Sequence, residues 1–345
     1  MFSSGKKSIG RKKSLMKALV FTDKEQLQYQ SVPSPTPKGE ELLVKVSAAG
    51  ICGSDMHAYH GFDDRRIPPL ILGHEISGTI ENSNENVIIN PLITCGKCYE
   101  CKNGIEHLCQ TRSLIGMSKP AERHGGFAEF VTVPGKNLHY TNKKNILLHL
   151  ALTEPTAVSF HAIELAKKHS IKELSESKIL IIGGGAIGLL AGLILNSIGI
   201  KDYTIIDTNK KRLDVCKNAA GCQIYLPDDH KIRENYYDIV IDAVGLEKTR
   251  QKSIKCIKQG GSIIHIGLSQ PAGDFDFRKT TLQEIIFIGT YCYTDQDFKK
   301  SINLIEDNKL GDLNWLDFRS LSDGSTAFKE IHDGSTASPK IILIP

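Results

Sequence analysis

The chain has 345 residues, of which 40% are hydrophobic and 24% are charged, and its formal net charge is +4. This composition is typical of an ordinary soluble globular protein, and it excludes an intrinsically disordered or collagen-like chain. The length favours two domains over one.

The positive charge is concentrated at the amino terminus. Residues 1–15 contain five lysines and arginines and no acidic residue, so the rest of the chain is close to neutral. A near-neutral body has no general affinity for nucleic acid or anionic membranes, and we expect neither as a partner. Because the segment lacks the apolar region of a secretory signal, we interpret it as a disordered basic extension and expect a cytoplasmic protein. An over-long start before Met16 and an organellar transit peptide are the alternatives.

The next part of the chain, residues 17–150, is rich in short strand signals and turns. Apolar or alternating runs predict strands over 42–46, 87–89 and 127–133. The prolines within residues 33–39 predict a loop, because proline removes a hydrogen-bond donor from a sheet. We therefore expect a first domain that is rich in β-structure.

From about residue 155 the pattern changes to alternating strands and helices. Strands are predicted over 178–182, 203–207, 238–242, 261–266 and 285–290, and helices over 186–197, 209–219 and 249–258. This alternation predicts a doubly wound parallel sheet with helices on both faces. The chain then continues with an amphipathic helix over 295–309 and ends in a strand over 340–344.

One uncharged run, residues 179–200, is long enough to span a membrane. Three consecutive glycines divide it into a short strand, a turn and a helix. We therefore expect no membrane-spanning segment there.

Four closely spaced cysteines form the pattern C-x2-C-x2-C-x7-C, at Cys95, Cys98, Cys101 and Cys109. Four thiolates at this spacing can converge on one tetrahedral zinc ion, and such a site is structural because it leaves no open position. An iron–sulfur cluster is an alternative, although the long last gap and the absence of a proline after Cys109 differ from the ferredoxin pattern. Disulfides are disfavoured in the reducing compartment that we expect.

A second group of potential metal ligands is spread along the first domain. Cys52 lies within Gly-Ile-Cys-Gly-Ser-Asp-Met-His, His74 within Gly-His-Glu, and Glu154 before a proline. A cysteine, a histidine and a carboxylate can hold a zinc ion with water in the fourth position, which is the pattern of a catalytic site. The spacing alone does not establish such a site, since lone cysteines and histidines are more often structural.

The glycines after the strand predicted over 178–182 have the spacing of a dinucleotide-binding loop, G-x-G-x-x-G, at Gly183, Gly185 and Gly188. The first glycine permits a tight turn, the second lets the backbone approach a pyrophosphate, and the third allows a helix to pack closely on a strand. The phosphates then meet free N–H groups at the start of the helix, at Ala186 and Ile187.

Asp207 ends the next predicted strand, about 20 residues further on, where an acidic residue hydrogen-bonds the ribose hydroxyls. A carboxylate at this point repels a 2′-phosphate, so NAD is favoured over NADP. Lys210, Lys211 and Arg212 follow closely and weaken that preference. A doubly wound fold that has lost its cofactor is the alternative.

Together these motifs resemble those of the zinc-dependent medium-chain alcohol dehydrogenases, and within them the polyol branch typified by sorbitol and threonine dehydrogenases. The resemblance runs from Met16 to the carboxyl terminus, and it is carried by the four cysteines and by segments 50–55, 73–75, 125–129, 154–155 and 183–188. It implies a two-domain α/β protein, with a GroES-like β-barrel catalytic domain over 16–154, completed by 295–345, and a Rossmann domain over 155–294. Relatives usually have a longer strand–turn–strand between Gly78 and Pro91, which leaves the local barrel geometry in question.

The resemblance also implies roles for individual residues. The ligands implied for a catalytic zinc ion are Cys52, His74, Glu75 and Glu154, the last directly or through bound water. Ser54 matches the hydroxyl that accepts the proton of the substrate alcohol, His57 the outer member of a proton relay, and Asp55 a carboxylate that orients His74. The nicotinamide side of the cofactor site is implied to include Val244, Ile266 and Gly267. Further side chains either face the substrate or are solvated loop residues: Tyr59, His60, Arg65, Arg66 and His124.

The resulting prediction is a zinc- and NAD-dependent dehydrogenase that oxidises a secondary alcohol of a polyol, such as sorbitol or L-iditol, to a ketone. Glutamate at position 154, where ethanol-type relatives have cysteine, favours the polyol branch. We expect two zinc ions per chain, one catalytic and one structural, and a homo-oligomer, either a dimer or a tetramer. A sugar phosphate, threonine or a simple alcohol as substrate, and a non-catalytic relative of the same fold, are the alternatives.

Overall fold

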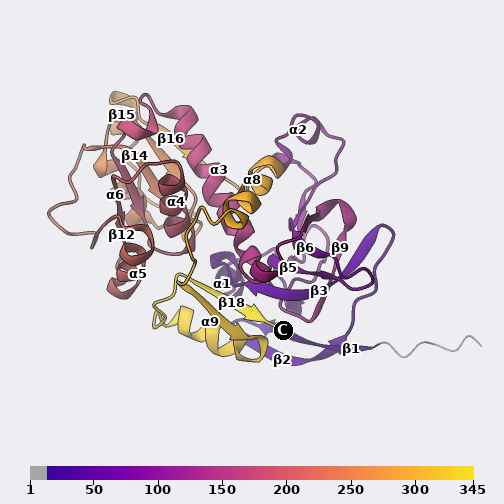
Figure 1. Cartoon of the computed structure of the whole chain (residues 1–345). Coiled ribbons are helices and arrows are strands. Elements are labelled where there is room, and N and C mark those ends of the chain that lie inside the picture. Colours follow the sequence, from indigo (N-terminus) through magenta and orange to yellow (C-terminus); the bar gives the residue numbers. More distant parts are fainter. Residues whose placement is uncertain (1–13) are drawn as a thin grey trace, which may run out of the picture.

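The computed structural model describes residues 14–345, which form a β-barrel part and a parallel-sheet part (Figure 1). Apart from its last two residues, the basic extension expected over residues 1–15 lies outside the described residues. Leu15 already belongs to the strand β1 (Leu15–Asp23), in which it pairs with Pro33.

The largest sheet combines strands from both ends of the chain. In spatial order it contains β10 (Leu138–Thr141), β6 (Asn86–Ile89), β5 (Glu75–Ile80), β3 (Glu41–Gly50), β18 (Lys340–Ile344) and β17 (Leu316–Ser320), while β9 (Phe130–Pro134) also pairs with β3. The last strand, β18, runs antiparallel to β3, with Ile342 opposite Gly50. In Figure 1 the yellow carboxyl-terminal strand therefore lies among the indigo strands of the amino-terminal part.

A smaller sheet and several short elements complete the barrel part. The sheet contains β2 (Gln26–Pro33), β1 and β4 (Leu70–Ile71), and the short strands β7 (Leu92–Ile93) and β8 (Ser113–Leu114) pair with each other. The helices are α1 (Gly53–Tyr59), α2 (Tyr99–Lys102) and α9 (Gly324–His332). Phe328 of α9 meets Phe127 edge to face in the core, with ring centroids 5.9 Å apart and both side chains fully buried. The carboxyl-terminal segment is thus part of the barrel core.

The strands predicted over 42–46 and 87–89 are confirmed within β3 and β6. The strand predicted over 127–133 begins later, because the preceding residues bridge the two sheets: Glu129 N donates to Lys17 O of β1, and Val46 N of β3 donates to Glu129 O. The segment in question between Gly78 and Pro91 forms a regular antiparallel hairpin, with Ile76 opposite Ile89 and Thr79 opposite Asn86. Its short connection does not interrupt the sheet.

The second part contains a parallel sheet of six strands in the order β13-β12-β11-β14-β15-β16. The strands are β11 (Ile179–Ile182), β12 (Tyr203–Ile206), β13 (Gln223–Tyr225), β14 (Tyr237–Asp242), β15 (Ile257–His265) and β16 (Ile286–Gly289). Numbered along the chain, this order is 3-2-1-4-5-6, the doubly wound Rossmann topology. The central strand β11 is buried at every residue, as expected for a strand covered on both faces.

The helices of this part are α4 (Ala186–Ser197), α5 (Lys210–Ala220), α6 (Glu247–Cys256) and α7 (Phe277–Leu282). The helix predicted over 186–197 is confirmed to the residue, and the other two predicted helices begin or end within two residues of the expectation. The strand predicted over 261–266 begins earlier, at Ile257, because Ile257 already pairs with Tyr237 of β14. The pairing is then interrupted up to Ser262, around two glycines. The three-residue strand β13 was not predicted.

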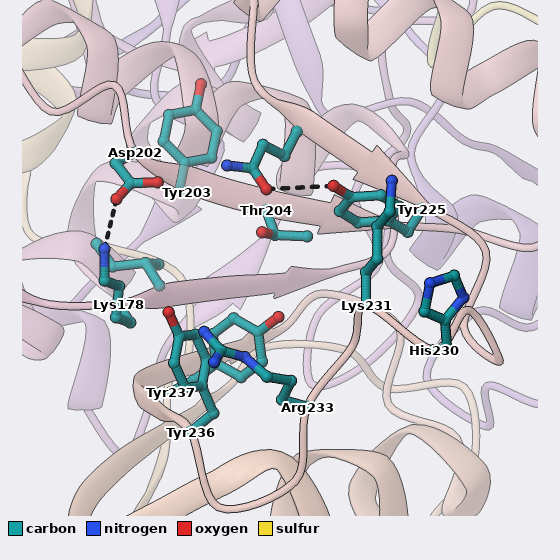
Figure 2. Close-up of a pocket in the computed structure, with 12 residues that line it drawn as sticks. Lys178, Asp202, Tyr203, Thr204, Tyr225, His230, Lys231, Arg233, Tyr236 and Tyr237 are labelled. Atoms are coloured by element: carbon teal, nitrogen blue, oxygen red, sulfur yellow. Dashed lines mark hydrogen bonds and ion pairs between the residues drawn. The ribbon is translucent and has the colours of Figure 1, made fainter.

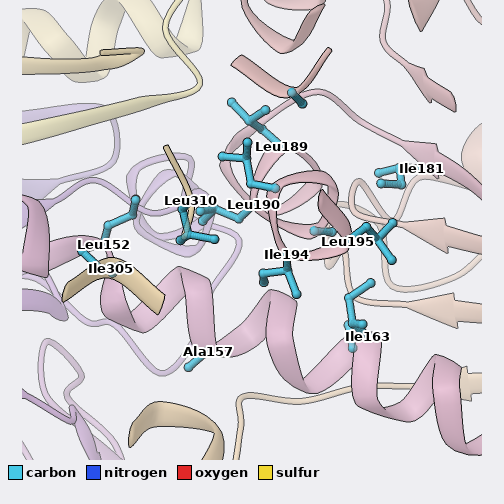
Figure 3. Close-up of a cluster of buried hydrophobic side chains, with 14 of the residues drawn as sticks. Leu152, Ala157, Ile163, Ile181, Leu189, Leu190, Ile194, Leu195, Ile305 and Leu310 are labelled. Carbon is cyan, nitrogen blue, oxygen red and sulfur yellow. The ribbon is translucent and has the colours of Figure 1, made fainter. Parts of the chain in front are cut away.

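The helices α3 (Thr153–His169) and α8 (Asp295–Glu306) lie between the two parts (Figure 1). Their apolar side chains pack on α4 in one buried cluster, shown in Figure 3, with Leu152, Ala157, Ile163, Leu190, Ile194 and Ile305 among its members. The cluster continues to Ala48 and Ile342 in the barrel strands. One apolar core therefore connects the two parts. No helix within residues 14–345 is both long and apolar enough to cross a membrane.

Candidate active site

Cys52 is held where β3 gives way to the helix α1. The strand ends at Gly50, and Cys52 is the N-cap residue of the helix. Its sulfur accepts a hydrogen bond from the backbone N–H of Ser54 at 3.5 Å, and the Asp55 carboxylate accepts one from the backbone N–H of Cys52 at 3.0 Å. These two bonds fix the position of the thiol.

His74 reaches the same point from the start of β5. It follows Gly73, which has φ +94° and at which a Cβ would lie 2.7 Å from the Phe127 ring, so a side chain cannot be accommodated there. His74 Nδ1 lies 3.4 Å from Asp55 Oδ1, and Nε2 lies 3.4 Å from Ser54 Oγ. Asp55 is therefore placed to orient the imidazole, with Nε2 on the side of Cys52 and Ser54.

Cys52, His74 and Glu75 each place a ligand atom within 4.8 Å of the other two. Burial by itself would lower the pKa of His74, but Asp55 and Cys52 raise it well above its usual value. The surroundings of His74 thus favour an added positive charge. A sulfur, a nitrogen and an oxygen donor in such surroundings fit a zinc ion.

The Glu75 carboxylate is also paired with a buried lysine. Lys340 Nζ lies 2.6 and 2.8 Å from the two carboxylate oxygens, and it donates a third bond to Ile51 O at 2.7 Å. The two side chains are 3% and 1% exposed. The carboxylate lies so close to Gly50 that a Cβ there would approach Glu75 Oε2 to 1.9 Å. If Glu75 coordinated a metal ion, its carboxylate oxygens would bind both the metal ion and Lys340.

Glu154 lies in the first turn of α3, outside the group of ligand atoms that are mutually within 4.8 Å. Its side chain is buried, and burial raises the pKa of Glu154 to about 7, with His74 opposing this change and Glu75 adding to it. The structure therefore places Glu154 near His74 and Glu75 without bringing it into the group of ligand atoms.

The four cysteines come together beside α2, with all sulfur atoms within 4.8 Å of one another. The N–H groups of Lys97 and Cys98 donate to Cys95 Sγ and lower the pKa of that thiol to about 6. Thiolate is the form that binds metal. These cysteines, like the others in residues 14–345, are free of disulfides. The arrangement fits a closed four-thiolate zinc site.

The glycine loop has the geometry that its spacing predicts. Gly183 has φ +104°, and a Cβ there would lie 2.6 Å from Val244 Cγ2. A Cβ at Gly188 would lie 1.8 Å from Gly183 O, so α4 packs directly on the end of β11. At Gly185, the N-cap of α4, a Cβ would meet nothing within 4 Å, and no side chain caps the helix. Open space beside free helix N–H groups fits a bound pyrophosphate.

Asp207 directly follows β12 and contacts this loop. One carboxylate oxygen accepts a bond from Gly184 N at 2.7 Å, and the other accepts one from Asn209 N at 2.8 Å. Arg212 Nη1 lies 3.6 Å from the same carboxylate. The acid expected at the ribose is therefore present and held by the backbone, with a cation beside it.

The residues expected at the nicotinamide side follow β14 and β15, at the carboxyl edge of the sheet where Gly183 also lies. Gly267 N and Ile266 N both donate to Asp242 O, and Gly267 packs directly on Val244 and Gly245. The Ile266 side chain packs against the large apolar cluster. Val244 and Gly267 are therefore near the loop, whereas the Ile266 side chain is engaged in the core.

Two cavities connect these groups. A cavity of about 210 Å³ is lined by Cys52 and Glu75 on one side and by Gly185, Ala186, Ile187, Gly188 and Arg212 on the other. A larger cleft of about 900 Å³ is lined by Ser54, His57 and Arg65 from the barrel part and by Gly267 and Leu268 from the parallel sheet. Some of the predicted metal-ligand, proton-relay and cofactor residues therefore face cavities between the two parts: Cys52, Glu75, Ser54, His57, Gly185 to Gly188, Arg212 and Gly267.

A third cavity, of about 430 Å³, lies at the opposite edge of the parallel sheet (Figure 2). Its lining includes Ile179, Tyr203 and Tyr237, the first residues of three strands, and the ion pair between Lys178 and Asp202. Because Gly183 follows the carboxyl end of β11, this cavity is separated from the cofactor loop by the length of the strands. None of the predicted site residues lines it.

Sequence reasoning missed two charged residues at the site. Lys340 was assigned only to a final strand, and nothing in the sequence links it to Glu75. From the sequence, Arg66 was either a substrate contact or a solvated loop residue. In the structure its side chain is buried and donates a hydrogen bond to Ser54. The adjacent Arg65 is partly exposed and lines the cleft.

Comparison with known proteins agrees with this geometry. Residues 38–143 match the alcohol dehydrogenase GroES-like domain, and residues 186–307 match the zinc-binding dehydrogenase domain. The chain belongs to the zinc-binding alcohol dehydrogenase family, whose members are oxidoreductases acting on alcohol groups.

Individual relatives have different substrates. The chain is 30% identical over 311 residues to an NAD-dependent alcohol dehydrogenase of Saccharolobus solfataricus, covering 82% of this chain and 87% of that protein. It is 28% identical to a sorbitol dehydrogenase of Halalkalibacterium halodurans, covering 96% and 99%. Among solved structures, galactitol-1-phosphate dehydrogenase from Escherichia coli matches with a TM-score of 0.83 and 24% identity, covering 96% and 100%.

Proposed function

We propose that the protein oxidises a secondary alcohol of a polyol to a ketone, with NAD as the hydride acceptor and a catalytic zinc ion. The observation that carries the proposal is the cavity lined by Cys52 and Glu75 and by Gly185 to Gly188, because it joins the metal-ligand group to the cofactor loop. In the reaction, the carbinol carbon loses a hydride to the nicotinamide and the hydroxyl loses a proton.

Cys52 and His74 would hold the catalytic zinc ion, with Glu75 or Glu154 as the carboxylate ligand. Glu75 lies within the group of ligand atoms but is also paired with Lys340, whereas Glu154 is buried nearby outside that group. Zinc, when bound, supplies Lewis-acid polarisation of the alcohol oxygen. Cys95, Cys98, Cys101 and Cys109 would hold the second, structural ion. We thus propose two zinc ions per chain.

Ser54 and His57 would carry the hydroxyl proton to solvent. Ser54 Oγ lies among the metal-ligand atoms, 3.4 Å from Cys52 Sγ and from His74 Nε2. His57 lies one turn further along α1, lines the same cleft and is half-buried. Burial lowers the pKa of His57 despite the opposing charge of Asp63. A neutral imidazole at pH 7 can accept the proton.

NAD is proposed over NADP because Asp207 is held beside the loop, where its charge opposes a 2′-phosphate. Cofactor contacts are assigned to Gly183, Gly185, Ala186, Ile187, Gly188, Asp207, Arg212, Val244, Ile266 and Gly267. The domain division is proposed as a catalytic domain over 16–154, completed by 295–345, and a Rossmann domain over 155–294.

A polyol is proposed over a simple alcohol because position 154 is glutamate, and because a sorbitol dehydrogenase matches nearly the whole chain.

We also propose a homo-oligomer, a dimer or tetramer. The edge strand β16 is unpaired on one side among the described residues, and exposed apolar side chains lie on and near it: Phe277, Leu282 and Phe287. Light scattering of the purified protein measures this state.

The free cysteines support a cytoplasmic location, which cell fractionation can test.

The test of the proposed function is a turnover screen. Purified, zinc-loaded protein is incubated with NAD or NADP and with polyols, sugar-alcohol phosphates, threonine or simple alcohols, and formation of the reduced cofactor is followed. We expect NAD reduction with a polyol and none in the Cys52→Ser protein. Absence of turnover with every alcohol would contradict the proposal, and preference for another alcohol class would correct the substrate.

A further inference from the structure

Arg66 is buried beside the proposed proton path. It lies in the loop between α1 and β4, and its side chain is fully buried. Its Nη2 donates a hydrogen bond to Ser54 Oγ at 3.2 Å, and its Nη1 forms an ion pair with Asp63. Charged side chains are almost never fully buried unless they are paired. One of the two partners of this cation is the hydroxyl closest to the metal-ligand atoms.

The chemistry of the guanidinium group gives this contact a single direction. Arginine has only donors and is not deprotonated in proteins, so Ser54 Oγ must be the acceptor. The Ser54 hydrogen is therefore not shared with Arg66. Its other neighbours, Cys52 Sγ and His74 Nε2, are the atoms that would face a metal ion. In the structure the Ser54 hydroxyl donates to Cys52 Sγ. With that sulfur bound to a metal ion, His57, one turn further along the same helix and lining the same cleft, is the acceptor that the proposed relay assigns.

We propose that Arg66 is a positioning residue for the proton relay. It occupies one lone pair of Ser54 Oγ, leaves the second for the substrate hydroxyl, and so reserves the Ser54 hydrogen for His57. The proton balance is complete: Ser54 receives the alcohol proton as its own proton passes to His57, and Arg66 neither gains nor loses one. This inference rests on the proposed function, because it concerns the same proton path.

Asp63 holds Arg66 in place and also provides a matched control. Its carboxylate accepts bonds from Arg65 Nε at 2.8 Å and Arg65 Nη2 at 3.0 Å, as well as from Arg66. Burial would raise the pKa of Asp63, but the two arginines lower it to about 2, so the carboxylate stays charged. Arg65 thus has the same charge and the same partner as Arg66. Its side chain is 43% exposed, and it makes no hydrogen bond to Ser54.

The first test compares Arg66→Met with Arg65→Met. For Arg66→Met we expect kcat for alcohol oxidation to fall about 10- to 100-fold, at or below the lower end for a placed acid–base group. KM should change little, and the solvent deuterium isotope effect on kcat should rise because proton transfer becomes slower. Arg66→Lys, which keeps the positive charge and an N–H donor, should restore part of the rate. Arg65→Met should show a smaller loss and the parental isotope effect. Zinc content and NADH affinity should equal those of the parent in every variant.

A double-mutant cycle with Ser54→Ala supplies the second test. If Arg66 acts through Ser54, Arg66→Met causes no further loss of kcat in the Ser54→Ala protein, and the two changes are non-additive in the free energy of unfolding. Losses of kcat that multiply, or free energies that add, would overturn the inference. The stability cycle needs no turnover. An inactive parent would therefore overturn the proposed function, whereas an additive cycle in an active parent overturns the role of Arg66 alone.

Discussion

The pKa of His57 is set by opposed contributions from its surroundings. Burial in the wall of the cleft lowers its pKa, while the Asp63 carboxylate raises it, and the net change is a lowering from the usual value. His57 is therefore uncharged above a pH that is lower than the ordinary histidine pKa of about 6.5. A histidine in this state can accept a proton across the neutral range.

Replacing His57 with glutamine keeps a hydrogen-bonding side chain that cannot titrate near neutrality. We expect kcat/KM for alcohol oxidation to fall most at pH 6–7, by up to about 100-fold, and to recover at higher pH, where hydroxide can accept the proton directly. The pH profile of kcat/KM measures this. A profile equal to that of the parent at every pH would mean that protons leave by another route.

Asp207 has two tasks at the cofactor loop, since its carboxylate holds two backbone N–H groups and also faces the ribose position. In the Asp207→Ser protein the repulsion of a 2′-phosphate is removed, and Arg212 is left without its acidic neighbour. We expect the NAD-to-NADP ratio of kcat/KM to narrow by about tenfold or more, since a tenfold change corresponds to only about 1.4 kcal/mol. Arg212→Gln should widen the ratio. A parent that prefers NADP would contradict this assignment.

At the scale of elements, the two cysteine sites are built differently. The four-cysteine group is formed by one local segment around α2, whereas Cys52 is placed by the junction of β3 and α1. A zinc ion bound by the four cysteines would contribute to folding, because it would join four side chains of one short segment. The second lies in a barrel that has its own apolar core.

Two serine substitutions separate these sites. Cys98→Ser should lower zinc content from two equivalents to one and reduce the thermal midpoint, because structural zinc contributes folding free energy. Cys52→Ser should abolish turnover with little change in the thermal midpoint. Metal analysis and calorimetry of both proteins measure the difference. Less than one equivalent of zinc in active parental protein would contradict the two-site assignment.

The elements that could be predicted from sequence are those with local signals. The helix at 186–197 was found because glycines and an uncharged run mark both its ends, and the four cysteines because their spacing is short. The helix α3 was missed, although Pro155 lies in its first turn, because its residues were taken as a ligand motif at a domain boundary. Arg66 and Lys340 could not be assigned from local pattern. Their partners are 12 and 265 residues away, and only the fold brings them together.

For the whole molecule, the ion pair between Lys340 and Glu75 connects the end of the chain to the metal-ligand group. Burial would lower the pKa of Lys340, but Glu75 and Cys52 raise it, so the ammonium stays charged. Lys340 belongs to β18, which also completes the barrel sheet beside β3. The same strand thus serves both the fold and the electrostatic balance of the site.

We therefore expect Lys340→Met to change both the free energy of unfolding and the affinity for zinc. Breaking a buried ion pair by removing one partner costs about 3–5 kcal/mol, so we expect a loss of this size in the free energy of unfolding. Zinc affinity should change as well, because the Glu75 oxygens are freed. Lys340→Arg should retain most of the stability, and Glu75→Gln should recover part of it in the Lys340→Met protein. Equal stability of Lys340→Met and the parent would contradict the ion pair.

The long sequence separation between Glu75 and Lys340 has a consequence for biosynthesis. The four cysteines lie together within residues 95–109, so that site can form as soon as this segment has been synthesised. The ammonium that neutralises Glu75 follows it by 265 residues in the chain. Until then a nascent chain carries an unbalanced carboxylate beside Cys52 and His74. The two metal sites are therefore expected to mature at different times, the structural one early and the catalytic one only after Lys340 has been synthesised and β18 has joined the barrel sheet.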